Sequence, residues 1–271
     1  MLGMCEGLSC SCNTHLVFLN YRWRLRMSAL TRIERERYDR QIVMHSWGES
    51  AQTRLKNSTV LIAGAGGLAS PVILYLAAAG VGTLRICDDG ELELSNLNRQ
   101  VVHSQQNLHK RKVDSAAASV GRLNSHTNVE ALCVRISRAN VDSVVDDARI
   151  MVDCLDNFAT RYVLNEHAVR KKMPLVHAGV TAYAGQVSFI HPPETPCLSC
   201  LIPEPPASGK FPILGATAGV IGSIQALEVL KYLTGIGSLL KSRILFFDGG
   251  EMKFHVSREE RVPTCTVCGH D

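Results

Sequence analysis

A glycine-rich run that follows an apolar stretch is the clearest candidate for a chemical site. Ser58-Thr59-Val60-Leu61-Ile62 has the pattern of a strand and leads into Ala63-Gly64-Ala65-Gly66-Gly67-Leu68-Ala69. Gly64 and Gly66 allow a tight turn that brings bare backbone close to a phosphate, and the helix that follows points its N-terminal N–H groups at the anion. The run therefore predicts a nucleotide site, although glycines also serve ordinary turns.

An acidic residue stands where the ribose of a nucleotide would lie. Asp88 comes 22 residues after Gly66, at the end of a second predicted strand, Thr83–Cys87. A carboxylate at that point can accept hydrogen bonds from a ribose hydroxyl. The alternative is a turn aspartate within Asp88-Asp89-Gly90. Ribose binding is the favoured interpretation, and it serves NAD and ATP equally.

Polar and cationic residues further along separate those two nucleotides. They are Ser95, Asn96 and Arg99 in a Ser-Asn-Leu-Asn-Arg-Gln run, Lys112 at the start of a helix, and Asp156-Asn157 after a strand. Hydride transfer needs an apolar nicotinamide pocket. Attack of a carboxylate on an α-phosphate instead brings two anions together, which requires cations and a metal held by a carboxylate. The residues favour adenylation over oxidoreduction.

Each of these residues also has a structural interpretation. Arg99 can form a surface ion pair, and Lys112 can be a solvated helix residue. Asp156 or Asn157 can cap the helix that begins near Phe158. The functional interpretation depends on their occurring together in this order.

Four cysteines predict a metal site. Cys197-x-x-Cys200 and Cys265-x-x-Cys268 are separated by 64 residues, which lets two knuckles close a tetrahedral thiolate site for structural Zn²⁺. A disulfide or redox pair is the alternative. With ten cysteines and no export signal, the chain is expected in the reducing cytoplasm.

Alternating strand and helix patterns predict an α/β fold: a Rossmann-like, mostly parallel sheet with helices on both faces, extended by antiparallel strands in the C-terminal half. The expected parallel strands are 59–63, 83–87, 129–136, 150–154 and 175–177, and the expected helices are 71–79, 112–123, 141–148, 158–170 and 218–233. The stretch 185–190 alternates like an antiparallel strand, and 244–247 and 252–256 complete the sheet.

The domain organisation follows from composition. Residues 1–30 are expected to be a disordered extension, and 31–271 a single domain with a crossing loop at about 192–214 that holds seven of the ten prolines. Residues 1–37 carry six arginines and three glutamates of a chain with net charge +4, so the rest has a net charge of +1. No basic stripe indicates a nucleic-acid groove, and no apolar run is long enough to cross a membrane.

Several motifs together resemble the MoeB/ThiF/HesA family, the prokaryotic relatives of ubiquitin-activating enzymes. The resemblance covers about residues 34–270 and rests on Arg37-Tyr38-Asp39-Arg40-Gln41, the glycine run, Ser95 to Gln100, Lys112-Val113-Asp114-Ser115, Asp153 to Asn157 with Arg161, and the cysteine pairs. It implies an adenylyltransferase that uses MgATP to activate the C-terminal Gly-Gly carboxylate of a small ubiquitin-fold sulfur carrier, as in molybdopterin or thiamine biosynthesis.

The resemblance also implies roles for individual residues. Gly66 and its neighbours Gly64 and Gly67 would face the nucleotide, Asp88 the ribose, and Asn96, Arg99 and Lys112 the phosphates, with Ser95 and Asn157 beside them. Asp156 would hold Mg²⁺. Arg40 would enter the ATP site of the partner in a homodimer, or else is a charge on a helix surface.

This chain departs from the family at two points. The segment Ser208 to Leu214 has no cysteine where relatives form a covalent link to the carrier, so the reaction is expected to stop at the acyl-adenylate. Cys87, Cys133 and Cys154 are expected to be core residues. Gly90 replaces a second acid, which leaves a secondary metal or ribose contact in doubt.

Three other functions stay open. They are a related enzyme that adenylates a carboxylate on a modified tRNA nucleoside, an NAD(P)-dependent oxidoreductase, and a binding module without catalysis.

Overall fold

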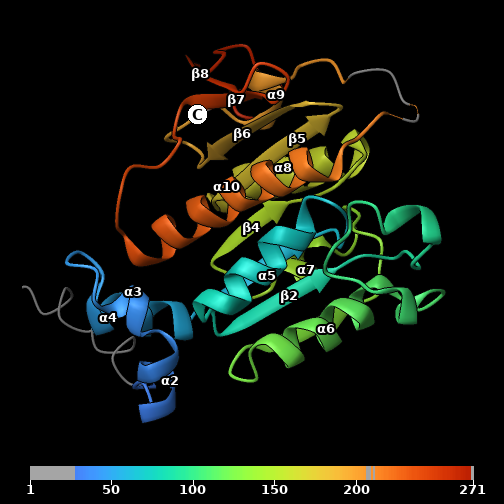
Figure 1. Ribbon diagram of the computed structural model, residues 1–271. Coiled ribbons are helices and arrows are strands. Elements are labelled where there is room, and N and C mark those ends of the chain that lie inside the picture. The colour runs from blue at the N-terminus through green and yellow to red at the C-terminus, as the bar shows by residue number, and fades with distance from the viewer. Residues whose placement is uncertain (1–27, 206–208, 210, 270–271) are drawn as a thin grey trace, which may run out of the picture.

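A single sheet organises the chain. The computed structural model describes residues 28–205, 209 and 211–269. The strand order in the sheet is β3-β2-β1-β4-β5-β6-β7-β8, with helices on both faces (Figure 1). The strands are β1 (Thr59–Ala63), β2 (Thr83–Cys87), β3 (Asn128–Leu132), β4 (Ile150–Asp153), β5 (Leu175–Thr181), β6 (Ala184–Ile190), β7 (Arg243–Asp248) and β8 (Lys253–Arg258).

The first five strands form the predicted parallel half. β1 pairs in parallel with β2 on one side and β4 on the other, and β3 and β5 extend the pairing outward. β1 and β4 are apolar along almost their whole length because both of their faces are covered. The carboxyl ends of these strands therefore meet at one edge of the sheet, where doubly wound folds bind ligands.

The last three strands form the predicted antiparallel extension. β6 runs antiparallel to β5, with Gly179 opposite Gln186, and β7 and β8 continue in the same manner. The connection between β6 and α10 (Gly215–Thr234) is the proline-rich crossing loop, which includes the one-turn helix α9 (Leu198–Leu201). The fold class predicted from the sequence is confirmed.

Helices divide between the two faces according to their apolar residues. One apolar cluster joins the sheet to α5 (Ala69–Ala79), α6 (Lys112–Leu123) and α10. The other joins the opposite face to α7 (Val141–Val145), α8 (Phe158–Lys171) and α9. Two 3₁₀ turns, η1 (Leu94–Asn96) and η2 (Gln105–Asn107), lie between β2 and α6.

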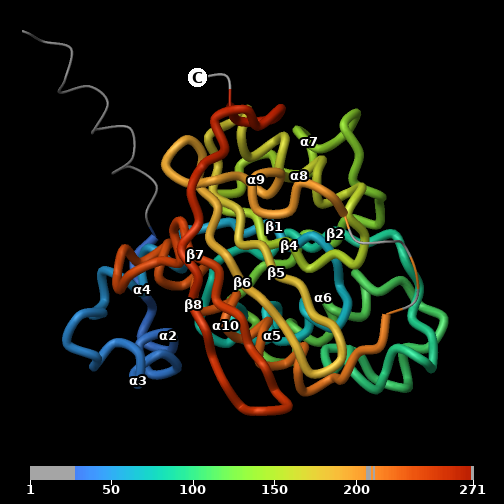
Figure 2. Tube along the Cα trace, turned by 90° about the horizontal axis from the view of Figure 1, so that it is seen from above, coloured from blue at the N-terminus to red at the C-terminus, as the bar shows by residue number. Residues whose placement is uncertain are grey.

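Three short helices precede the sheet in the chain: α2 (Arg32–Arg37), α3 (Asp39–Ile42) and α4 (Gly48–Lys56). They gather at one end of the molecule, apart from α7 (Figure 2). Gln41 and Gln52 both donate to the carbonyl oxygen of Ala79, at 3.1 and 2.8 Å, and so cap the C-terminal end of α5. This anchor fixes α3 at the end of α5 that is opposite to the glycine loop.

Several element boundaries differ from the predictions. β3 ends at Leu132 rather than at residue 136, and α7 ends at Val145 rather than at 148 because Asp146 has a positive φ of 45°. β5 continues to Thr181, and α10 begins at Gly215 rather than at 218. Gly80 ends α5 in the left-handed conformation, as predicted.

Residues 1–30 were predicted to be disordered, and residues 1–27 of this segment lie outside the described residues. Its last three residues are described. Leu30 is buried, and Asn57 accepts a hydrogen bond from the Ser28 backbone at 3.0 Å. These three residues belong to the folded body.

Candidate functional site

A pocket of about 1470 Å³ opens at the carboxyl ends of the parallel strands. It is lined by the glycine loop, by the ends of β2 and β4, by the first turn of α8 and by β5 and β6. The site residues predicted from the sequence that line it are Gly64, Gly66, Gly67, Asp88, Arg99, Lys112, Asp156 and Asn157. Segments more than 100 residues apart in the chain thus meet at one place.

The glycines of the loop have different physical roles. Gly64 has φ of +100°, and a Cβ placed on it would lie 2.8 Å from the carbonyl oxygen of Cys154, so no other residue fits. Gly66 and Gly67 would meet nothing closer than 3.5 Å. Gly64 therefore makes the turn, and Gly66 and Gly67 keep the surface next to the pocket free of side chains.

Asp88 holds the glycine loop in place. Its Oδ2 accepts a hydrogen bond from the Ala65 backbone at 2.8 Å, and its Oδ1 accepts one from Gly90 at 2.8 Å. The turn interpretation of Asp88 is correct in this respect. Each carboxylate oxygen retains a second acceptor site, so the same side chain can also bind a ribose hydroxyl.

Lys112 and Arg99 supply positive charge on either side of the loop. Lys112 begins α6, and its Nζ would lie 3.5 Å from a Cβ on Gly90. That same Cβ would lie only 3.0 Å from Asp88 Oδ1, so Gly90 leaves room for the Asp88 carboxylate. Arg99 donates from Nη1 to the Ser95 carbonyl and to Asn98 Oδ1, both at 2.9 Å, and contacts the Gly67 side of the loop.

Ser95 and Asn96 do not line the pocket. The buried Asn96 side chain accepts from the Glu93 backbone at 3.1 Å, and the Asn96 carbonyl accepts from the Arg99 backbone at 3.1 Å. These residues build the 3₁₀ turn that carries Arg99. The geometry supports a positioning role for them rather than direct contact with a ligand.

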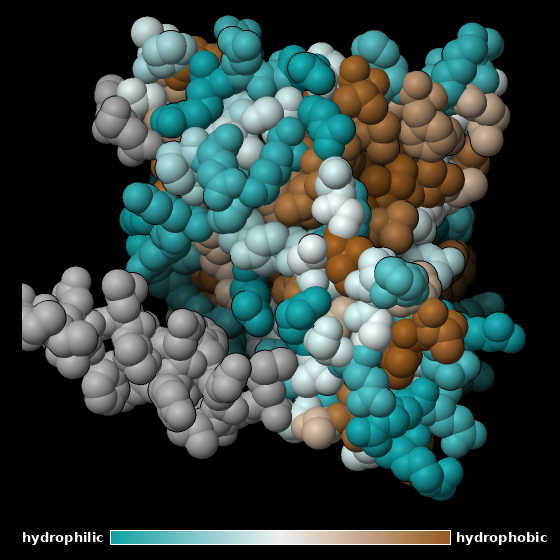
Figure 3. Space-filling view, turned by 90° about the vertical axis from the view of Figure 1, so that its left-hand side faces the viewer, coloured by the Kyte–Doolittle hydropathy of each residue, from teal (hydrophilic) through white to brown (hydrophobic). Residues whose placement is uncertain are grey.

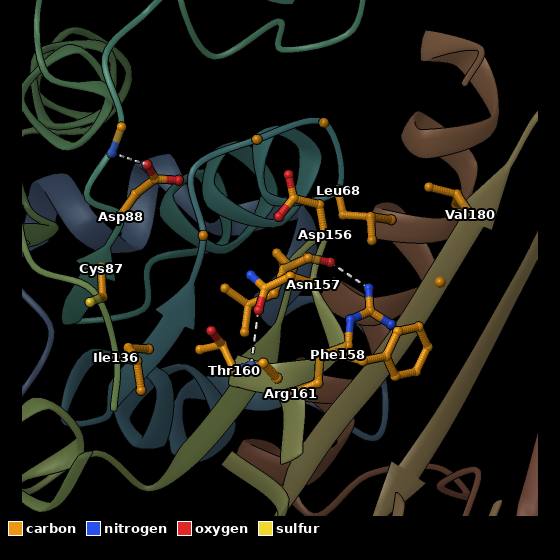
Figure 4. A pocket seen from close by; sticks show the side chains of 18 of the residues that line it. Leu68, Cys87, Asp88, Ile136, Asp156, Asn157, Phe158, Thr160, Arg161 and Val180 are labelled. Carbon is orange, nitrogen blue, oxygen red and sulfur yellow. Dashed lines mark hydrogen bonds between the residues drawn. The ribbon is translucent and has the colours of Figure 1, made fainter. Parts of the chain in front are cut away.

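Asp156 and Asn157 differ although they are adjacent. Asn157 caps α8, because its Oδ1 accepts from the Thr160 backbone at 2.9 Å (Figure 4). Asp156 is exposed to the pocket and forms no hydrogen bond or ion pair with any residue in the described ranges. Its carboxylate is therefore available to a metal ion, whereas the Asn157 side chain is already engaged in the structural role.

A buried polar cluster lies behind Asp156. His177 Nδ1 lies 2.7 Å from Asp153 Oδ2, and Arg161 lies 3.7 Å from Asp153 Oδ1. Burial by itself would raise the pKa of Asp153, but the charge of Arg161 and the hydrogen bond from His177 lower it overall. Burial also lowers the pKa of His177, so the cluster is an ionised Asp153 with a neutral histidine and an arginine.

The cluster shapes the chain leading to Asp156. The Leu155 backbone donates to Asp153 Oδ1 at 3.1 Å, and the Leu155 carbonyl accepts a hydrogen bond from Arg161 Nη2. In Figure 4, Asp88 and Arg161 lie on opposite sides of Asp156. Both the N–H and the carbonyl of Leu155, the residue before Asp156, are thus held by hydrogen bonds.

His103 was not singled out from the sequence. It is buried, with Nε2 2.9 Å from the Ala65 carbonyl oxygen and Nδ1 2.9 Å from Ser115 Oγ. Burial lowers its pKa, so it is neutral near pH 7, and the carbonyl of Ala65 requires the proton on Nε2. His103 therefore ties the glycine loop to α6, one turn after Lys112. No local spacing in the sequence signals this contact.

The three cysteines expected to be core residues occupy different environments. Cys154 is buried, and its pKa is raised by burial and by Asp153. Cys87 lines the pocket, but burial and the nearby Asp88 raise its pKa to about 12. Cys133 is half-buried. Cys87 and Cys154 stay protonated at neutral pH and are poor nucleophiles.

The four cysteines predicted to bind zinc lie together. The sulfur atoms of Cys197, Cys200, Cys265 and Cys268 are all within 4.8 Å of one another, with Sγ–Sγ distances of 3.9, 3.8 and 3.4 Å for three of the pairs. Four thiolates around one zinc ion at about 2.3 Å each stand about 3.8 Å apart. The geometry fits a closed zinc site that joins α9 to the C-terminal segment.

Arg40 does not line the pocket. It is an exposed residue of α3, next to Gln41, which binds the C-terminal end of α5. The 11 residues of α5 span about 16 Å between that end and the glycine loop. Arg40 therefore stands away from the pocket of its own chain.

The family model for the ThiF family matches residues 38–267. The SAMP-activating enzyme E1 of Haloferax volcanii is 42% identical over 240 residues, which are 86% of this chain and 88% of that protein. The adenylyltransferase and sulfurtransferase MOCS3 of Drosophila persimilis is 38% identical over 246 residues, 88% of this chain and 54% of that protein. The chain therefore belongs to the ThiF family, and it is an adenylyltransferase.

A solved structure supports the same conclusion. The crystal structure of E. coli MccB with ATP has a TM-score of 0.77 and 26% identity, and the match covers 86% of this chain and 74% of that chain. The fold and the family expected from the sequence are confirmed. In the described part of the chain, the helices are all too short or too polar to cross a bilayer.

Proposed function

We propose that this adenylyltransferase activates the C-terminal Gly-Gly carboxylate of a small ubiquitin-fold sulfur carrier at the expense of ATP. The observation that carries the proposal is the set of charges in one pocket. Lys112 and Arg99 lie beside the glycine loop, and Asp156 has no hydrogen-bond or ion-pair partner in the described part of the chain. Such a set suits a reaction in which one anion attacks another.

The chemistry follows from these positions. A carboxylate oxygen of the carrier attacks the α-phosphorus of ATP, the bond to the bridging oxygen breaks, and pyrophosphate leaves, which yields an acyl-adenylate. The glycine loop and Asp88 orient the nucleotide, and Lys112 and Arg99 stabilise the charge on the phosphates. Asp156 would hold Mg²⁺, which when bound neutralises phosphate charge.

The pocket has an arm for the polypeptide substrate. Beyond Asp156 it continues over β5 and β6 as far as Phe246, beside Phe211 and Ile213 of the crossing loop. Phe254 and Val256 of β8 are also exposed, but they lie on the opposite face of the sheet, because they pair with Phe247 and Leu245, which pack with α10. Figure 3 shows hydrophobic residues gathered in the upper right part of one face of the molecule.

We infer that the reaction ends at the acyl-adenylate. The raised pKa values of Cys87 and Cys154 argue against either as an acceptor of the acyl group. The segment from Ser208 to Leu214 has no cysteine. A sulfur donor from another protein would then attack the acyl-adenylate. We expect the enzyme to act in the cytoplasm, where its thiols stay reduced.

Two further assignments complete the proposal. Zn²⁺ bound by the four cysteines would be structural, because four protein ligands leave no position for substrate. The distance of Arg40 from its own pocket supports a homodimer in which Arg40 acts in the site of the partner subunit, since one copy cannot bring it to the phosphates.

Exchange of labelled pyrophosphate into ATP tests the function. Exchange is expected only when a carrier ending in Gly-Gly is present, and truncation of the two glycines should abolish it. Release of AMP that depends on tRNA would instead support the tRNA-modifying alternative. Thermal stabilisation by NADH but not by MgATP would overturn the proposal in favour of an oxidoreductase.

A further inference from the structure

Two side chains in the substrate arm of the pocket have hydrogen-bond donors without acceptors. Arg161 is only 6% exposed, yet among the described residues its side chain makes one hydrogen bond, from Nη2 to the Leu155 carbonyl. Its Nε faces Asp153 Oδ1 at 3.7 Å, an ion-pair distance that is too long for a hydrogen bond. Gln186 is half-buried, and its side-chain amide makes no hydrogen bond within the same described ranges. A buried guanidinium normally uses most of its five N–H groups.

The free donors of the two residues converge on one point. A Cβ placed on Gly179 would lie 3.7 Å from Arg161 Nη1 and 3.7 Å from Gln186 Nε2. Gly179 and Gln186 are opposite each other in the β5–β6 pairing, so both present the same face of the sheet. Because Gly179 has no side chain, the space between the two nitrogens stays open to a main chain that approaches the sheet.

The space between Arg161 Nη1 and Gln186 Nε2 lies in the part of the pocket that is proposed to bind the polypeptide substrate. Arg161, Gln186 and Gly179 line the same pocket as Asp156 and lie on its substrate side. Arg161 also holds the carbonyl of Leu155, the residue before Asp156. In Figure 4 its guanidinium lies over the Phe158 ring and toward Val180 of β5, and the guanidinium carbon is 5.0 Å from the ring centroid.

The charge balance indicates a neutral acceptor. Asp153 is fully buried and already compensates the charge of Arg161 at 3.7 Å. A main-chain carbonyl oxygen needs N–H donors but brings no further charge.

We propose that Arg161 Nη1 and Gln186 Nε2 bind the carbonyl oxygen of the last peptide bond of the substrate. This inference rests on the proposed function, and it assigns the residues that orient the acyl substrate rather than ATP. When this carbonyl is held by the two donors, the terminal glycine lies beyond it. Its carboxylate then points toward Asp156 and Lys112. Because Gly179 has no side chain, the substrate tail can approach the backbone of β5 closely.

The test is Gln186→Leu, because Gln186 has no other partner in the described structure and its loss leaves the fold intact. With a recombinant ubiquitin-fold carrier ending in Gly-Gly, we expect pyrophosphate exchange to show a KM for the carrier about tenfold higher. The KM for ATP should change less than about twofold. Gln106→Leu, at an exposed position outside the pocket, is the matched control.

Gly179→Val is the second variant. Valine suits a strand, so the melting temperature should hold, but its methyl groups occupy the space between the two donors. We expect MgATP binding by calorimetry to persist while carrier-dependent exchange is lost. Full exchange in Gly179→Val, or an unchanged carrier KM in Gln186→Leu, would overturn the inference.

The experiments distinguish a failure of the proposed function from a failure of the proposed donor pair. If the wild-type enzyme shows no exchange with any Gly-Gly carrier of its host, the proposed function is wrong. If the wild type exchanges normally and Gln186→Leu does too, only the donor pair is wrong.

Discussion

The two arms of the pocket are built in opposite ways. On the nucleotide side, polar side chains bind the protein's own backbone. Asp88 accepts from the N–H groups of Ala65 and Gly90, and His103 binds the Ala65 carbonyl. On the substrate side, Arg161 Nη1 and Gln186 have no acceptor among the described residues. The hydrogen bonds of the first arm are already made without ligand, whereas the second arm has donors that a ligand would have to satisfy.

This difference separates two tasks. A nucleotide is the same in every turnover, so a preformed cradle costs no reorganisation at the moment of reaction. A polypeptide end must enter from solvent, and open donors give it hydrogen bonds that the free enzyme lacks. Five predictions test this contrast, beginning with the largest expected effect.

Asp156→Ala should reduce carrier-dependent exchange by about 10²-fold to 10³-fold, because it removes the carboxylate proposed to bind Mg²⁺. Lys112→Met should have a comparable effect through the phosphates. The measurement is the rate of exchange at saturating ATP and carrier. Activity of Asp156→Ala near the wild-type level would place the metal elsewhere.

Arg40→Ala should also lose about 10²-fold in exchange if Arg40 acts in the partner's site. A mixture of Arg40→Ala and Asp156→Ala subunits should then recover part of the activity, since each mixed dimer has one intact site. The exchange rate of the mixture, measured after subunit exchange, reports this directly. A mixture no more active than its components would rule out action between subunits.

His103→Phe should raise the KM for ATP about tenfold and leave the KM for the carrier unchanged, because it releases Ala65 and Ser115 on the nucleotide side only. His167→Phe is the matched control, since His167 is a buried histidine that binds Asp142, and neither residue lines the pocket. Equal changes in both KM values would show that the two arms are not separable.

Cys200→Ser should lower the melting temperature without changing the KM for ATP, because the cysteine site joins α9 to the C-terminal segment and not to the glycine loop. Metal analysis of the wild type should give one zinc per chain, and a strong chelator should reproduce the loss of stability. A zinc-free wild type with the same melting temperature would exclude the structural metal.

Stability should fall moderately as the pH drops below 6.5, the ordinary pKa of histidine. Burial lowers the pKa values of His103, His167 and His177, so the unfolded chain binds more protons than the folded one below that pH. The lowered pKa of Asp153 affects stability only at pH values below about 4. Urea unfolding at pH 7.5 and 5.5 measures the change, and higher stability at pH 5.5 would contradict it.

The contrast between the arms also explains what the sequence could predict. Gly64, Asp88 and Lys112 follow strands or begin helices at regular spacings, so local patterns indicated both the elements and the pocket. The four cysteines were equally clear. The position of Arg40 relative to the pocket, by contrast, depends on how α3 packs against the end of α5. The spacing of residues in the sequence does not predict that contact.

Other features depended on tertiary contacts that the sequence does not reveal. Asn157 is a helix cap and Asn96 a turn residue, and a motif alone could not separate these roles from ligand contact. His103 meets Ala65 from 38 residues away. The convergence of Arg161 and Gln186 requires the β5–β6 register, in which Gly179 lies opposite Gln186.

The central claim is that a carboxylate attacks the α-phosphorus within this pocket. A carrier whose C-terminal carboxylate contains ¹⁸O, incubated with MgATP and a thiol that attacks the acyl-adenylate, tests it by mass spectrometry of the nucleotide. We predict that one ¹⁸O atom appears in AMP, because the bridging oxygen comes from the carrier. Label in inorganic phosphate with formation of ADP, or unlabelled AMP, would contradict the account.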